Sequence, residues 1–243
     1  MMRSGNPALR GDVFGHSPAF AKTSGVMTIQ GTVNKAFLMA LIVILSASLV
    51  WNRPAAAAAF LLPSVIAGLI IAIITVFKKE YSAYTAPIYA LTQGIVLGSI
   101  SAFFETSYPG IVIQAVGLTL STLLCMLIAY KTGAIRATEG FKLGVMAATG
   151  GIALFYAASL IMGFFGFNMG FIYSTTPMGI VFSAVVVVIA ALNLVIDFDF
   201  IQKGAAYNAP GYMEWYSAFA LMVTLIWLYL EILRLLSKTR NRW

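Results

Sequence analysis

Three acidic residues stand inside long apolar stretches in the C-terminal quarter of the chain. Asp197 and Asp199 interrupt one such stretch, and Glu231 interrupts the next. A carboxylate at membrane depth costs about 2.5–3.5 kcal/mol on insertion scales, so it is usually retained because it faces a cavity, a partner or an ion path. Two such positions on consecutive apolar segments therefore indicate the handling of protons or cations.

Helical spacing separates the two aspartates from each other. Residues two apart on a regular helix point about 200° away from each other, so Asp197 and Asp199 cannot both face one site. In a plainer interpretation, both aspartates mark the cytoplasmic end of the sixth apolar segment. Glu231 then forms a local pair with Arg234, three residues further on. The residues by themselves leave this interpretation open beside the ion-handling one.

The composition indicates a membrane protein. Of 243 residues, 60% are apolar and 9% are charged, against roughly 25% charged in a soluble domain. Mean hydropathy is +0.92. The net charge of +7 comes from basic residues in short connections and at both ends, which suits anionic lipid headgroups better than nucleic acid. We expect the lipid bilayer as a partner and no nucleic acid; protein partners cannot be inferred.

Seven apolar segments follow one another, most of them near the ~20 residues that a transmembrane helix needs. Proline, glycine and charged residues separate them, and no alternation typical of a β-barrel is present. We predict an all-α membrane protein whose seven-helix transmembrane domain occupies residues 36–243. The predicted spans are 36–51, 55–77, 83–104, 109–130, 142–165, 177–199 and 215–236.

Residues 1–35 differ from the rest and are predicted to form a mobile, basic, cytoplasmic tail. A cleaved signal peptide is disfavoured because the stretch before the first apolar segment is too long. With the N-terminus inside, Arg53 is the only basic residue in the connections on the opposite side, as the positive-inside rule requires. Seven full crossings would place the basic C-terminus outside, whereas a last segment that enters and returns would keep it inside. The sequence leaves that choice open.

Conventional catalytic groups are scarce. The single histidine, His16, lies in the tail, so neither a Ser–His pair nor an H-E-x-x-H zinc site can form in the membrane. The single cysteine, Cys125, is expected to be a small packing residue. Hard oxygen ligands remain, which suit Ca²⁺, Mg²⁺ or protons rather than zinc. We expect no enzyme and no resident cofactor, with Ca²⁺ only as a transported ion.

Small residues predict close helix packing. Gly94 and Gly98 form a G-x-x-x-G pair in the third segment, and Gly150 and Gly151 are adjacent in the fifth. Close approach of membrane helices depends on such residues, because lipid gives no hydrophobic drive for association.

Three short motifs carry a resemblance to a known family. They are Phe198-Asp199-x-x-Gln202, Tyr229-Leu-Glu-Ile-Leu-Arg-Leu-Leu236 and the opening Met27-Thr-Ile-Gln-Gly-Thr-Val-Asn-Lys35. With the seven-span layout, they resemble the Bax inhibitor-1 family, and the opening resembles its bacterial branch. The resemblance covers about residues 27–240. It implies two three-helix layers around a central last helix, in a bacterial inner membrane with the N-terminus in the cytoplasm.

The resemblance also implies a function and a site. Family members resemble pH-sensitive calcium leak channels, in which two acidic residues of the sixth and seventh helices share a proton and gate the pore. The matching residues here are Asp199, or in second place Asp197, together with Glu231. Lys78 is the expected basic partner from the second helix. Deprotonation of the Asp199–Glu231 pair would create an oxygen-lined site for Ca²⁺ and repulsion between like charges.

This chain departs from the family pattern in three ways. Glu231 replaces an aspartate, Lys78 replaces an arginine and so loses a bidentate clamp, and the spacing from Asp199 to Glu231 is longer. With that spacing, the two carboxylates meet only if residues 205–222 form a broken or interfacial segment, or if the sixth helix is displaced inward.

Two other functions use similar residues. A proton-coupled secondary transporter would use the same carboxylates but is expected to show inverted repeats and broken helices, and no half-to-half similarity is evident. An intramembrane aspartyl protease also needs two membrane carboxylates, but its Gly-x-Gly-Asp pattern does not occur in the sequence.

Overall fold

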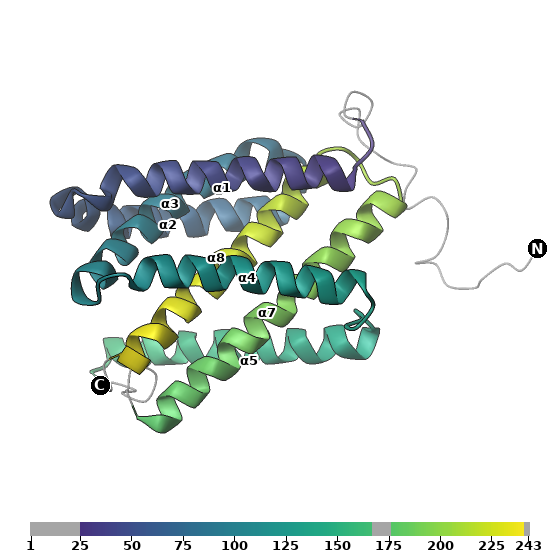
Figure 1. Ribbon diagram of the computed structural model, residues 1–243. Helices are drawn as coiled ribbons and strands as arrows, with labels where there is room; N and C mark the ends of the chain where they lie inside the picture. The colour runs from purple at the N-terminus through teal and green to yellow at the C-terminus, as the bar shows by residue number, and fades with distance from the viewer. Residues whose placement is uncertain (1–24, 167–175, 241–243) are drawn as a thin grey trace, which may run out of the picture.

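The computed structural model describes residues 25–166 and 176–240 (Figure 1). In this part of the chain, all seven long helices have the length and apolar character of membrane spans, and the only β-structure is an isolated bridge between Val26 and Pro210. The predicted all-α protein with seven membrane helices is therefore confirmed. The helices are α1 (Ile29–Trp51), α2 (Pro54–Phe77), α3 (Ser82–Ser107), α4 (Ile111–Lys131), α5 (Glu139–Phe164), α7 (Pro177–Ala206) and α8 (Met213–Arg240), with a short 3₁₀ turn η4 (Lys79–Tyr81) before α3.

Local sequence signals set the helix starts. Thr28, Thr138 and Thr176 each precede a helix, and each side-chain oxygen accepts a hydrogen bond from a backbone N–H in the first turn, which satisfies a donor without a partner inside the helix. The Thr28 cap starts α1 at Ile29 rather than at residue 36. The predicted tail falls mainly on residues 1–24, which lie outside the described residues.

The helices form two groups of three with α8 between them (Figure 1). Helices α1, α2 and α3 pack together on one side, and α4, α5 and α7 lie on the other. Helix α8 contacts α1 and α3 in the first group and α4 and α7 in the second. This is the predicted arrangement of two layers around a central last helix.

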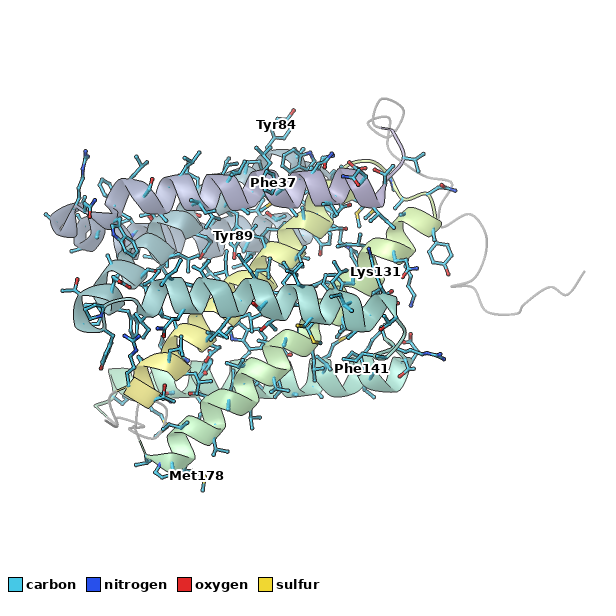
Figure 2. The ribbon with its side chains drawn as sticks, in the orientation of Figure 1. Phe37, Tyr84, Tyr89, Lys131, Phe141 and Met178 are labelled. Carbon is cyan, nitrogen blue, oxygen red and sulfur yellow. The ribbon has the colours of Figure 1, made fainter. Side chains whose placement is uncertain are left out.

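The two ends of the bundle can be defined by the helices that begin and finish there. We call the end where α1 begins the proximal end; it also holds η4, the α4–α5 turn and the α7–α8 turn. The distal end holds the α1–α2 and α3–α4 turns, the start of α7 and the end of α8 (Figure 1). Figure 2 labels Lys131 near the proximal end and Met178 near the distal end. Because α8 is continuous over its 28 residues, the last segment crosses the bundle completely.

Glycines account for the close contact between α1 and α3. A Cβ atom added to Gly94 would lie 2.5 Å from the carbonyl oxygen of Val43, and one added to Gly98 would lie 2.5 Å from that of Ala47. The G-x-x-x-G prediction is thus confirmed for this helix pair.

Two packing predictions were wrong. A Cβ atom at Gly150 or Gly151 would meet no atom within 4 Å outside its own helix, because α5 packs mainly against α7 along another face. Cys125 is exposed on α4 and faces away from the bundle.

Candidate ion-handling site

Asp199 lies near the proximal end, within an ion-pair network. Its Oδ2 atom is 2.8 Å from the Lys142 ammonium and 3.0 Å from that of Lys203, and the Asp199 side chain is 14% exposed. Lys142 also contacts Glu139 at 3.2 Å. Two cations beside one carboxylate favour its ionised form, so Asp199 is already compensated in the described structure.

Helix geometry explains this network. Helix α7 continues past residue 199 to Ala206, so Asp199 lies inside the helix and Lys203 follows one turn later on the same face. Lys142 stands in the first turns of α5, directly after the α4–α5 turn at the same end of the bundle. Next to this network, the Tyr130 hydroxyl donates a hydrogen bond to the Gln202 side chain.

Asp197 lies about half a turn of α7 before Asp199 and faces α8. The Thr224 hydroxyl of α8 lies against its carboxyl group. The Oδ2 atom of Asp197 is buried and has no hydrogen-bond partner among the described residues. Buried polar atoms are nearly always satisfied, so an exception calls for an explanation. Asp197 therefore differs from the other two predicted acids, which both have cationic partners.

Glu231 belongs to a third environment, near the distal end. Its side chain is 2% exposed. The Nη1 atom of Arg234 donates to both carboxylate oxygens, at 3.0 and 3.1 Å, and the Tyr156 hydroxyl donates to Oε1 at 3.1 Å. Arg234 also donates to the Tyr156 hydroxyl at 2.8 Å and lies 5.2 Å from the centre of its ring. The local Glu–Arg pair considered from the sequence is present, with a tyrosine of α5 added.

The structure does not bring Asp199 and Glu231 together. Helices α7 and α8 run antiparallel (Figure 1). At 1.5 Å per residue, Asp199 lies about 10.5 Å before the end of α7 and Glu231 about 27 Å after the start of α8, which separates them by about 16.5 Å along the bundle. Residues 213–222 are part of the unbroken helix α8, so the broken segment that could have joined the two carboxylates is not formed. In this arrangement they cannot share a proton or bind one Ca²⁺ ion.

Lys78 is not the partner of either acid among the described contacts. It ends α2 at the proximal surface, where it is exposed and lies 5.7 Å from the Tyr81 ring centre. Helix α2 packs mainly against α3. The basic partners are Lys142 and Lys203 for Asp199 and Arg234 for Glu231.

Sequence reasoning missed two buried charged groups. Glu214, in the first turn of α8, is 8% exposed, forms an ion pair with Lys35 and accepts hydrogen bonds at 2.8 Å from both the backbone N–H and the hydroxyl of Thr28. A signal was available: an acid in the first turn of the last span, at the same end of the bundle as a lysine near the start of the first span.

Lys238 is the second missed group. It is 4% exposed, and its ammonium donates to the Ser183 hydroxyl at 2.8 Å and the Gly179 carbonyl at 3.1 Å. Arg234 and Lys238, both in the last turns of α8, therefore form hydrogen bonds within the bundle.

These groups provide carboxylates at three depths, with no cluster of three metal-binding side chains within the described residues. This arrangement places Asp199 and Glu231 in separate ion pairs. It does not form a resident metal centre from the described side chains.

Comparison with known proteins agrees with this architecture. The family described as "Bax inhibitor 1 like" matches residues 6–241, nearly the whole chain. Neither the curated proteins nor the solved structures that were compared gave a match. The multi-pass membrane bundle, with its acids on the last two helices, is therefore that of a member of the Bax inhibitor 1-like family.

Proposed function

We propose that this protein is a pH-sensitive cation leak pathway, with Ca²⁺ as the transported ion. The family is linked to ion and Ca²⁺ leak and is generally channel-like rather than enzymatic. The observation that carries the proposal is the buried, unpartnered Oδ2 atom of Asp197. It lies between a proximal carboxylate and a distal carboxylate that are each neutralised by basic side chains.

In this proposal, Asp197 is the group whose protonation controls flux. When protonated, it leaves the α7–α8 interface beside Thr224 without a negative charge. When ionised, it gives a cation an oxygen ligand at a depth where no lysine or arginine compensates it among the described contacts. Direct proton sharing between Asp199 and Glu231 would first require three ion pairs to break, two at Asp199 and one at Glu231. The structure therefore favours Asp197 over Asp199, the reverse of the order expected from the family motif.

The test is Ca²⁺ flux from liposomes across a pH series, with the full-length protein reconstituted. Asp197→Asn keeps the size of the side chain and is expected to abolish the pH dependence. Asp199→Asn and Glu231→Gln should change the rate but keep a pH-dependent step. Glu80→Gln, at an exposed acid of η4, is the matched control. Loss of pH dependence in Asp199→Asn alone would move the site there, and unchanged pH dependence in all three variants would refute the proposal.

We also propose a cytoplasmic N-terminus. Support comes from the proximal end, where most of the connecting basic residues gather: Lys78, Lys79, Lys131, Arg136, Lys142 and Lys203. His16→Cys in a Cys125→Ser background should react with an impermeant thiol reagent from the cytoplasmic side only. Reaction from the outside would reverse the orientation.

A further inference from the structure

Two cavities adjoin the distal end of α1. The first has a volume of about 510 Å³. It lies between α1 and α4, and residues of α3 and α8 complete its lining. Its walls are almost entirely apolar, with Val43, Val116 and Ile226 among them. Ile44 and Leu120, also in its lining, are 63% and 52% exposed, so the cavity opens toward the lipid-facing side between α1 and α4.

The second cavity, of about 660 Å³, lies between α2 and α3. Its lining is mostly apolar, with Ala58, Leu61 and Ile100 among it, and Thr106 and Ser107 add polar groups. Phe103, which also lines it, is 69% exposed. Both volumes are within the ~300–1,000 Å³ typical of pockets that hold small ligands. Because both cavities open on the surface that faces hydrocarbon, an apolar chain can enter either one without crossing water.

Trp51 and Asn52 line both cavities. They end α1 at the distal surface, so the two cavities descend into the membrane from one common edge. Tryptophan is typical of the membrane–water interface, where its ring lies at the level of the headgroups. Arg53, the next residue, is exposed and places a fixed positive charge at this edge.

We propose that this edge binds one two-chain anionic glycerophospholipid of the distal leaflet. Its phosphate would lie at Arg53 and Asn52, one acyl chain in the α1–α4 cavity and the other in the α2–α3 cavity. The features that select this ligand are two apolar cavities, a shared polar edge and an adjacent guanidinium, which match two chains, a glycerol region and a phosphate. The inference is independent of the leak function proposed above.

The first acyl chain would contact the central helix directly. Met222, Leu225 and Tyr229 of α8 line the α1–α4 cavity, and the Tyr229 hydroxyl shares a 2.6 Å hydrogen bond with Ser101 of α3. Tyr229 is two residues before Glu231. Lipid bound here would therefore stabilise one position of the helix that carries the distal carboxylate.

The test is native mass spectrometry of the full-length protein purified in detergent and titrated with defined lipids. The probes are phosphatidylglycerol, phosphatidylcholine and the single-chain lysophosphatidylglycerol. The unmodified protein should retain one phosphatidylglycerol, should prefer it to phosphatidylcholine, and should retain the single-chain lipid less well.

Two substitutions fill the cavities separately. Val116→Trp and Ala58→Trp should each lower phosphatidylglycerol retention by about tenfold, since each expels several methylene groups from apolar burial. Ile113→Trp on α4 and Ala59→Trp on α2 are the matched controls: both positions are exposed and outside the two cavities. Arg53→Gln should remove the preference for the anionic headgroup, whereas Lys131→Gln at the proximal end should not.

Equal retention in the cavity variants and their controls would show annular lipid only and overturn the proposal. Equal retention of the single-chain lipid, or loss in only one of the two cavity variants, would overturn the two-chain assignment. Circular dichroism of each variant confirms that the helices persist, so that a loss of lipid can be read as loss of the site.

Discussion

The ion pairs at the two ends of the bundle use the same chemistry in different surroundings. At the proximal end, the side chain of Asp199 is 14% exposed and that of its partner Lys203 is 48% exposed. At the distal end, Glu231 is 2% exposed and is held by Arg234 and a tyrosine hydroxyl. Exposed pairs contribute little because water screens them, whereas a buried charge that loses its partner is strongly destabilising. The two ends should therefore respond very differently to loss of the cation.

Arg234→Met should have the largest effect. It leaves Glu231 buried without its direct ion-pair partner, and we expect the free energy of unfolding to fall by about 3–5 kcal/mol. Denaturant unfolding of the purified protein in micelles, followed by circular dichroism, measures this change. Lys131→Met, at an exposed lysine of α4, is the control. The double variant Arg234→Met with Glu231→Leu should recover most of the loss. A loss below about 1 kcal/mol would show that the distal pair behaves like a surface pair.

Gly31→Ala tests whether the buried Glu214–Lys35 ion pair stabilises the proximal end. A Cβ atom at Gly31 would overlap the Glu214 carboxylate, which binds Lys35 and the Thr28 cap. We expect a loss of about 1–3 kcal/mol in unfolding free energy from this overpacking. Gly117→Ala on α4, where a Cβ atom meets nothing within 4 Å, should instead gain about 0.5–1 kcal/mol. Equal effects at the two glycines would show that packing of Glu214 against Gly31 does not stabilise the proximal end.

Replacing either lysine that pairs with Asp199 should have a smaller effect on stability, and the two effects should differ. Lys142 joins α5 to α7 and its side chain is 14% exposed, whereas Lys203 is on the same helix as Asp199 and far more exposed. Lys142→Met should lower the free energy of unfolding by about 1 kcal/mol, and Lys203→Met should lower it by about 0.3–0.5 kcal/mol. The same unfolding experiment at low salt and at high salt should show both costs shrinking with salt. A larger cost for Lys203→Met would place the main compensation within α7.

Glu139→Gln should have the smallest effect. Its side chain is 90% exposed although it contacts Lys142, so we expect unfolding free energy to change by less than about 0.5 kcal/mol. The same assay checks this. A larger loss of unfolding free energy would mean that Glu139 orients Lys142 toward Asp199. The exposed Glu139 would then strengthen the ion pair between Lys142 and Asp199.

Much of the fold could be predicted because the membrane imposes simple requirements. A span must satisfy its backbone internally and must be apolar over a fixed length, so the seven helices and their order are visible in the pattern of apolar runs. Helix ends were less accurate. Helix α7 continues past Asp199 and Lys203 to Ala206, because these two side chains form an ion pair one turn apart that the helix accommodates.

The site was predictable only as a set of residue types. That Asp197, Asp199 and Glu231 carry the unusual charge follows from their apolar neighbours, and that the two aspartates point apart follows from helix geometry. The partner choice did not follow, since Lys78 and Lys142 are equally basic and both adjoin spans. Only the packing of α5 beside α7, with α2 held against α3, decides that Lys142 reaches Asp199 and Lys78 does not.

The sequence by itself determined the membrane class, the number of crossings and the shortage of groups for covalent or soft-metal chemistry, because these depend on composition and on short-range pattern. Tertiary structure alone decided that Asp199 and Glu231 lie at different depths, that Glu214 and Lys238 are buried, and that Asp197 has an unpartnered oxygen. The physical reason is that the cost of a charge depends on what surrounds it. Those surroundings come from helices far apart in the chain.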